Sequence, residues 1–324
     1  MNEDQQQPKL MSHAEVLSRG AGSAPFLVPG LVSADLTGVI GEPYAGKSSL
    51  VVNLVNGALT TGDFLGRRFT RRPERAVLVC TDAGLADEYA RRLEELAGPG
   101  SDFGSVIYAE RAPRSPDGWE GFAQKARIGS GTLVVVDNLS GVVDTNNAQE
   151  VRPFLAAVVD VCVTARRAPV VVVAHSSAKP GFNGRKAKGP MGLTSISGAF
   201  RLELRVAAGS GGALTVETKG NQIREPERLC LTRGSAGAGD LHVTSSEPLS
   251  ESAARRQTKT LDQRADMARF VVEQCQGLSK ADAAAALART FGGSSGTHAK
   301  RLQPSQPLGQ QLVHQDGSWA LASV

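Results

Sequence analysis

The segment that most constrains how this chain folds lies near its start and fits the pattern G-x-x-x-x-G-K-[ST]. Its residues are Gly41, Glu42, Pro43, Tyr44, Ala45, Gly46, Lys47 and Ser48. An apolar run, Leu36–Ile40, precedes the segment, and a helix-like stretch from Ser49 to Leu59 follows it. A strand, a glycine-rich turn and a helix N-terminus in this order direct backbone N–H groups and the helix dipole toward an anion. We therefore expect Gly41 through Ser49 to bind the phosphates of ATP, with Lys47 at the β and γ phosphates and Ser48 on Mg²⁺.

Length and composition indicate what kind of protein contains this loop. The chain has 324 residues, of which 41% are hydrophobic, so it can hold about two domains with buried cores. No apolar run approaches the roughly 18 residues of a membrane span, and residues 1–7 lack a signal-peptide pattern, which predicts a cytoplasmic protein without a membrane partner. The four cysteines lie far apart, so neither a zinc site nor a disulfide framework is indicated. The net charge of +4 does not by itself identify a nucleic-acid partner.

Short apolar runs alternate with helix-like segments over most of the chain, which predicts an α/β fold with a mostly parallel sheet covered on both faces. Later runs lack long intervening helices and predict an antiparallel extension of that sheet. We expect residues 1–24 to be a flexible segment, 25–244 the main domain, 245–258 a polar linker and 259–324 a small second domain. The predicted parallel strands are Leu36–Ile40, Ala76–Cys80, Val106–Ala109, Leu133–Val136 and Val170–Ala174, and the later ones are Arg201–Ala207, Leu214–Thr218 and Arg228–Leu231.

Three polar side chains follow predicted strands at the edge where such sheets bind ligands. Asp137 follows Leu133–Val136 and is expected to hold the Mg²⁺, directly or through water. Asp82 follows Ala76–Cys80 and is either the base that orients the attacking water, with Glu88 in reserve, or only the cap of the next helix. His175 follows Val170–Ala174 and is expected to sense the γ phosphate through a hydrogen bond, either to the phosphate or to the attacking water.

The order of these elements over residues 25–232 resembles the RecA-like P-loop ATPases, and more narrowly the replicative hexameric helicases of plasmids and phages. The resemblance implies a RecA-like core, a homo-oligomer such as a ring or hexamer, and single-stranded DNA bound at the ATPase core. The segment from Glu217 to Arg224 resembles the hairpin that such proteins present to a neighbouring subunit's nucleotide. It implies that Lys219 or Arg224 stabilises the transition state in trans, with the choice between them open. Members of the group usually carry Glu where this chain has Asp82, which implies slow hydrolysis.

A basic stretch follows the His175 strand directly. Its cations have no acid between them, and the glycines around them indicate a mobile loop that contacts a nucleic-acid backbone electrostatically; a solvated loop with charges for solubility is the alternative. The cations are Lys179, Arg185, Lys186 and Lys188. If the resemblance holds, the loop lines the central channel of a ring or filament.

The C-terminal part, residues 259–324, shows a pattern of three helices and a hairpin centred on Asp316-Gly317. This pattern resembles a winged helix-turn-helix, a module that binds DNA or another protein. A third helix, Gly296–Leu302, is then expected to place four residues near phosphates or bases: Thr297, His298, Lys300 and Arg301.

Three function classes fit these observations. The first is an ATP-dependent DNA-binding motor, helicase-like, from the replication system of a plasmid, phage or other mobile element. The second is a nucleic-acid-binding ATPase that does not unwind, such as a recombination factor or a regulator. The third is a small-molecule kinase, which needs neither a hairpin acting in trans nor an extra binding module.

Overall fold

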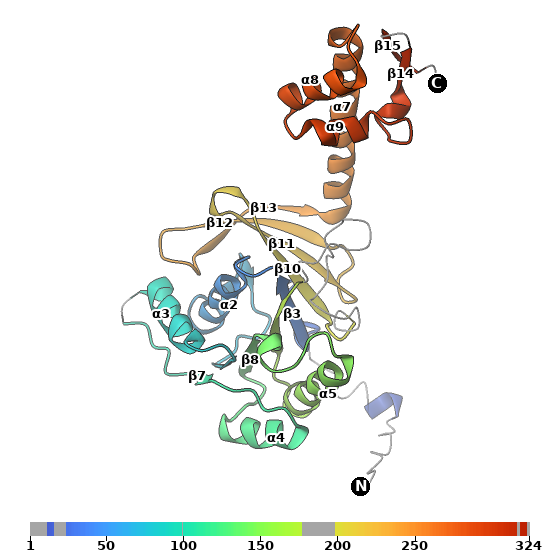
Figure 1. The fold of residues 1–324 in the computed structure, drawn as a ribbon. Helices are drawn as coiled ribbons and strands as arrows, with labels where there is room; N and C mark the ends of the chain where they lie inside the picture. Colours follow the sequence, from blue (N-terminus) through green and yellow to red (C-terminus); the bar gives the residue numbers. More distant parts are fainter. Residues whose placement is uncertain (1–11, 16–23, 99, 177–197, 316–317, 323–324) are drawn as a thin grey trace. The chain divides into compact units, whose positions relative to one another are not determined.

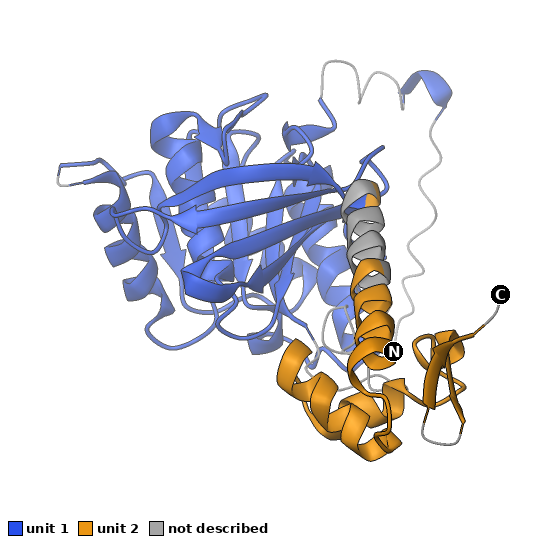
Figure 2. Cartoon of the chain, turned by 90° about the horizontal axis from the view of Figure 1, so that it is seen from above, with its two compact units in different colours: residues 1–249 blue, residues 250–324 orange. Residues whose placement is uncertain are grey.

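The computed structural model describes residues 12–15, 24–98, 100–176, 198–315 and 318–322, with only the backbone described for 251–261. The chain divides into two compact units, residues 1–249 and 250–324 (Figure 2). The expected flexible segment 1–24 and the basic stretch lie largely or wholly outside the described residues.

The first unit is built on a nine-stranded sheet with the order β13-β12-β11-β10-β3-β9-β8-β6-β7 (Figure 1). The strands from β10 to β7 are parallel, and β10 through β13 pair antiparallel. The predicted α/β fold with a mostly parallel sheet and an antiparallel extension is therefore confirmed. The strands are β3 (Leu36–Gly41), β6 (Arg75–Cys80), β7 (Val106–Ala109), β8 (Thr132–Asp137), β9 (Val170–His175), β10 (Leu202–Ala208), β11 (Leu214–Gly220), β12 (Glu227–Arg233) and β13 (Leu241–Pro248).

Helices cover both faces of the parallel strands. Residues of α2 and α3, such as Leu50 and Tyr89, pack with one face of the sheet, and residues of α4 and α5, such as Trp119 and Phe154, pack with the other. The strands are apolar on both faces for this reason, as the fully buried Val134–Val136 shows. The helices are α2 (Lys47–Asn56), α3 (Leu85–Ala97), α4 (Pro116–Lys125) and α5 (Ala148–Val158), with short turns η1 (Gly57–Thr61), η2 (Leu139–Gly141), η3 (Val159–Thr164) and η4 (Ser210–Gly212).

Strand β13 was not predicted from the sequence. Its burial is confined to Leu241 at the start and a half-buried end, so it carries no alternating apolar pattern. The stretch 245–258, expected to be a linker, forms the end of β13 and the start of α7 (Leu249–Gln274) instead. Backbone pairing with β12 thus orders a polar segment that hydropathy alone assigns to a loop.

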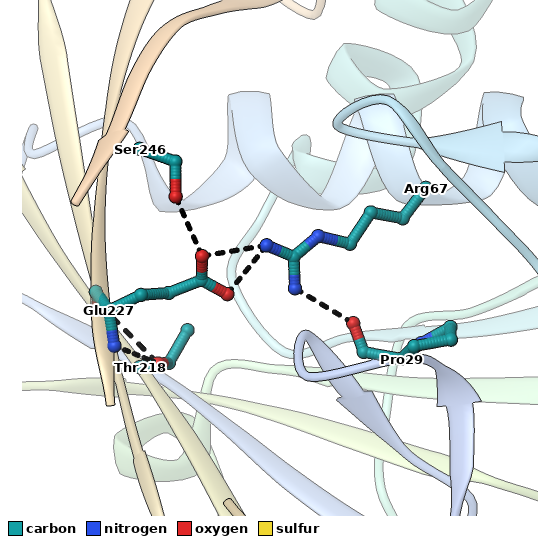
Figure 3. A network of polar contacts seen from close by, with 5 residues as sticks. All are labelled: Pro29, Arg67, Thr218, Glu227 and Ser246. Atoms are coloured by element: carbon teal, nitrogen blue, oxygen red, sulfur yellow. Dashed lines mark hydrogen bonds and ion pairs between the residues drawn. The ribbon is translucent and has the colours of Figure 1, made fainter. Parts of the chain in front are cut away.

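A polar clasp joins the start of the first unit to the antiparallel strands (Figure 3). Arg67 donates to the carbonyl oxygen of Pro29 at 3.0 Å and pairs with the Glu227 carboxylate at 2.7 Å. Ser246 donates to the same carboxylate, also at 2.7 Å. The clasp links two small hairpins to β12 and β13, so that four stretches distant in sequence support one another. These hairpins are β1 (Phe26–Val28) with β2 (Val32–Ser33), and β4 (Asp63–Phe64) with β5 (Arg67–Arg68).

The second unit has its own apolar core, which includes Met267, Leu287 and Trp319. Its elements are the later part of α7, α8 (Lys280–Phe291), α9 (Ser295–Arg301), η5 (Gly309–Gln311) and the hairpin β14 (Leu312–Gln315) and β15 (Ser318–Leu321). Ser279 and Ser294 cap α8 and α9 by accepting N–H bonds from Asp282 and Thr297. Three helices and a hairpin are thus present, as the sequence predicted. In the part of the chain that the structure describes, no helix combines the length and apolar character needed to cross a bilayer.

Candidate active site

The predicted phosphate-binding loop joins the end of β3 to the start of α2. Gly46 precedes the helix in the left-handed conformation, with φ of 94°, and an added Cβ would lie 2.6 Å from a methyl carbon of Leu214. Glycine is therefore required there both by the backbone and by space. Within the described residues no side chain caps α2, and its first turn contains no acidic residue. The N–H groups at this helix start are left for an anionic ligand.

Lys47 is the first residue of α2 after the loop and is only 6% exposed. Its ammonium donates to the carbonyl oxygens of Gly41 at 3.2 Å and Glu42 at 2.9 Å, and contacts Nδ1 of His175 at 3.2 Å. Burial lowers the pKa of Lys47, and the nearby Asp137 carboxylate acts in the opposite direction. Because an ammonium only donates, Nδ1 of His175 is the acceptor and carries no proton in this arrangement.

His175 ends β9, directly beside Gly41 in the parallel register. Burial and the charge of Lys47 lower the pKa of His175, while Asp82 acts in the opposite direction. A neutral imidazole therefore lies at the loop, where the sequence analysis placed a γ-phosphate sensor.

Asp137 ends β8 and is 5% exposed. Its Oδ2 atom lies 3.4 Å from Oγ of Ser48 and accepts a hydrogen bond from the hydroxyl of Tyr89. Burial raises the pKa of Asp137, and the Tyr89 hydrogen bond and the Lys47 charge offset this in part. Burial and Asp137 also raise the pKa of Tyr89 well above its usual value, so its hydroxyl keeps its proton and donates. Sequence reasoning did not identify Tyr89, because no motif marks a tyrosine in the second turn of a helix.

Asp82 lies two residues beyond Cys80, the last residue of β6, which pairs with Asp137, and Asp82 is exposed. Its Oδ2 accepts a hydrogen bond of 2.7 Å from the amide of Asn138, the residue after Asp137. The amide oxygen of Asn138 accepts bonds from Ser140 and from the N–H of Gly141, so this amide is fixed. Glu88, the reserve candidate for a base, pairs with Arg92 on α3.

Lys219 and Arg224 do not join this site within the chain. Lys219 pairs in the sheet with Glu203, which in turn pairs with Gly38 near the start of β3, whereas the loop follows the end of β3. Arg224 follows β11 still farther along this direction, and both side chains are exposed. The strand register thus places the two cations toward the end of the sheet where β3 begins, away from the end that carries the loop.

The remaining predicted contacts have different outcomes. The basic stretch with Lys179, Arg185, Lys186 and Lys188 lies outside the described residues. On α9, Thr297, Lys300 and Arg301 are exposed. The expectation for His298 is corrected, because its side chain is fully buried with Nε2 at 2.8 Å from the Gly292 carbonyl oxygen, and it cannot reach a nucleic acid at the surface.

The residues present fit a magnesium nucleotide. The uncapped N-terminus of α2 and the buried Lys47 suit the phosphates. The oxygens of Ser48 and Asp137 lie close to each other and are ligands of the kind that Mg²⁺ prefers. Among the described residues there is no group of three or more His, Cys, Asp and Glu side chains that would hold a metal by themselves. Mg²⁺ suits such a sparse site because it is usually held by one or two protein ligands together with phosphates and water.

A glycine-rich loop, its buried lysine and a carboxylate at the end of β8, which β9 separates from β3, have the arrangement of the nucleotide site of a P-loop ATPase. Residues 22–181, just under half of the chain, match the sequence model of a family described as the AAA domain, so this part of the chain is similar to AAA-type P-loop ATPase domains. An AAA domain implies nucleotide binding and supports ATPase activity. No curated protein sequence matches the chain.

Proposed function

We propose that the chain is an ATP-dependent DNA-binding motor, a helicase-like ATPase of a plasmid, phage or other mobile element. The observation that carries the ATPase part is the convergence of Lys47, Ser48 and Asp137 at the carboxyl ends of β3 and β8. In this proposal Lys47 neutralises charge on the β and γ phosphates, and Ser48 and Asp137 hold the Mg²⁺ that polarises them. Asp82 orients the attacking water, held in place by Asn138.

Assembly into a ring or filament is part of the proposal because, among the residues that the structure describes, Lys47 is the only cation at the site that could stabilise the transition state. Lys219 and Arg224 are exposed and lie toward the other end of the strands from the loop. A head-to-tail contact between copies would bring these cations to a neighbour's loop, and repetition of that contact gives a ring or filament. We expect Lys219 or Arg224 to act there in trans.

A specific observation favours the second candidate, a nucleic-acid-binding ATPase that does not unwind. Asp82 is shorter than glutamate by one methylene, and Asn138 already occupies one of its oxygens. A short carboxylate that is already hydrogen-bonded would activate water slowly. Slow hydrolysis suits a protein whose affinity for nucleic acid changes with the bound nucleotide better than it suits a fast motor.

ATP hydrolysis with and without single-stranded DNA, measured together with mass in solution, tests the proposal. A motor is expected to form a large assembly with ATP, to hydrolyse faster with DNA, and to separate a labelled duplex. DNA-dependent hydrolysis without strand separation supports the non-unwinding ATPase. Hydrolysis by a monomer that is indifferent to DNA contradicts both.

We also propose that the second unit contacts nucleic acid through the exposed side of α9 and a pocket beside it. The pocket, about 270 Å³, is lined by Arg264, Met267, Arg301 and Leu308 together with polar neighbours, none of them acidic. The guanidinium group of Arg301 contacts Met267, with Nη1 3.9 Å from the sulfur. In the described part of the chain neither arginine forms an ion pair. Two unpaired guanidinium groups suit a phosphate of the backbone.

Replacing both pocket arginines, Arg264→Gln and Arg301→Gln, is expected to weaken single-stranded DNA binding and to flatten its salt dependence. Loss of two phosphate contacts should reduce the slope of log K against log salt by about 1.4. Fluorescence anisotropy of a labelled oligonucleotide at several salt concentrations measures this slope. Arg289→Gln, at an exposed site on α8 outside the pocket lining, is the control. An unchanged slope in the double variant removes the pocket from the interface.

A further inference from the structure

Tyr89 is the one side chain that joins helix α3 to the carboxylate of the candidate metal site within the described residues. Its ring is 1% exposed and packs in the core between the sheet and α3. Its hydroxyl donates to Oδ2 of Asp137 and also lies close enough to Ser48 to interact with it. A core tyrosine usually needs some partner for its hydroxyl, but here the partner is one of the two predicted protein ligands of Mg²⁺.

The hydrogen bond from Tyr89 makes the two carboxylate oxygens of Asp137 different from each other. Oδ2 accepts from Tyr89 and faces Ser48 at 3.4 Å, whereas Oδ1 has no hydrogen bond within the described residues. A carboxylate held at one oxygen by a rigid, buried donor keeps one rotamer, since the tyrosine ring cannot move without disturbing the core. The orientation of Asp137 is then set before any ligand arrives.

We propose that Tyr89 is a positioning residue for the magnesium site, which fixes Asp137 so that its carboxylate and the Ser48 hydroxyl meet the same metal ion. The inference rests on the proposed ATPase site. Tyr89 acts only through Asp137 and touches neither the nucleotide nor the reacting atoms. It couples the placement of α3, which begins three residues after Asp82, to the metal ligand on β8.

Tyr89→Phe removes the hydroxyl and keeps the ring that packs in the core, so it separates the positioning role from packing. The affinity for a fluorescent ATP analogue is measured in the full-length protein by titration, once with excess EDTA and once with Mg²⁺. We expect affinity in EDTA to stay within about twofold of the wild type. The gain in affinity that Mg²⁺ provides should fall about tenfold, the effect of losing one hydrogen bond to a charged group.

Tyr108→Phe is the matched control. Tyr108 lies on β7, is partly buried against the same core, and its hydroxyl has no hydrogen bond among the described residues. This variant should keep the full magnesium gain. Tyr89→Phe combined with Asp137→Ala gives a second test. Alanine leaves neither a metal ligand nor an acceptor for the tyrosine hydroxyl, so the loss of that hydroxyl should then change the magnesium gain no further.

Three results decide the matter. A smaller magnesium gain in Tyr89→Phe, absent from Tyr108→Phe, supports the positioning role. Equal loss of affinity with EDTA and with Mg²⁺, or a full magnesium gain in Tyr89→Phe, overturns it while leaving the ATPase site in place. A wild-type protein that binds the analogue equally with and without Mg²⁺ overturns the proposed function itself, and the inference with it.

Discussion

Lys47→Ala is expected to remove ATP binding at micromolar nucleotide concentrations and to reduce hydrolysis to background. The ammonium is the only buried cation at the loop within the described residues, and it is held there by two carbonyl oxygens and His175. A charge-assisted contact with phosphate contributes about 3 kcal/mol in such a site, which is about 100-fold in affinity, and more where charge builds up in the transition state. Titration with a fluorescent ATP analogue and a phosphate-release assay measure the two losses.

The substitution also leaves three acceptors without their donor, so loss of function must be separated from loss of folding. Lys47→Met keeps the apolar length of the side chain and should lose nucleotide binding to the same extent, with thermal unfolding measured alongside. Lys125→Ala, at the exposed end of α4, is the control for removal of a positive charge and should bind as the wild type does. Unaltered hydrolysis by Lys47→Ala would remove the predicted site.

The sequence was sufficient for the centre of the fold because the local pattern and the tertiary structure agree there. The order of apolar strand, glycine turn and helix places Lys47 and Ser48, and a fully buried strand such as β8 can end at only one edge of a parallel sheet, which places Asp137. The predicted antiparallel extension followed from the shortness of the connections after β10. These features depend on backbone geometry and on burial, and both are visible in the spacing of residues.

Other features depend on contacts that spacing does not encode. Tyr89 reaches Asp137 across 48 positions of sequence, through the angle at which α3 lies on the sheet. The residues around Lys219 in the sequence resemble a catalytic hairpin. Only the strand register shows that Lys219 lies toward the end of the strands that is away from the phosphate-binding loop of the same chain. His298 has the surroundings of a surface residue in the sequence, yet the bend after α8 buries it against Gly292. In each case the outcome is decided by packing between distant segments.

Asp137→Asn is expected to reduce magnesium-supported hydrolysis at least about 100-fold, because a neutral amide binds and orients Mg²⁺ far less well than a carboxylate. The amide has the same shape, and its oxygen can still accept the Tyr89 hydrogen bond. Phosphate release at saturating Mg²⁺ and ATP measures the loss. Asp63→Asn, at an exposed position on β4, is the control and should hydrolyse ATP normally.

The same substitution should raise thermal stability when no metal is present. Burial raises the pKa of Asp137 above 3.8, so the folded state holds its proton more tightly than the unfolded state does. Stability then falls as the pH rises from the unfolded pKa through the folded one, and at neutral pH the buried charge carries its full cost. The amide in the Asp137→Asn variant would carry no such charge, so in EDTA the unfolding temperature of the variant should exceed that of the wild type.

With Mg²⁺ and ATP the order of the two unfolding temperatures should reverse, because ligand binding stabilises the folded wild type more than the variant. A variant less stable than the wild type in EDTA would mean that the carboxylate supports the fold and is not held there for the metal.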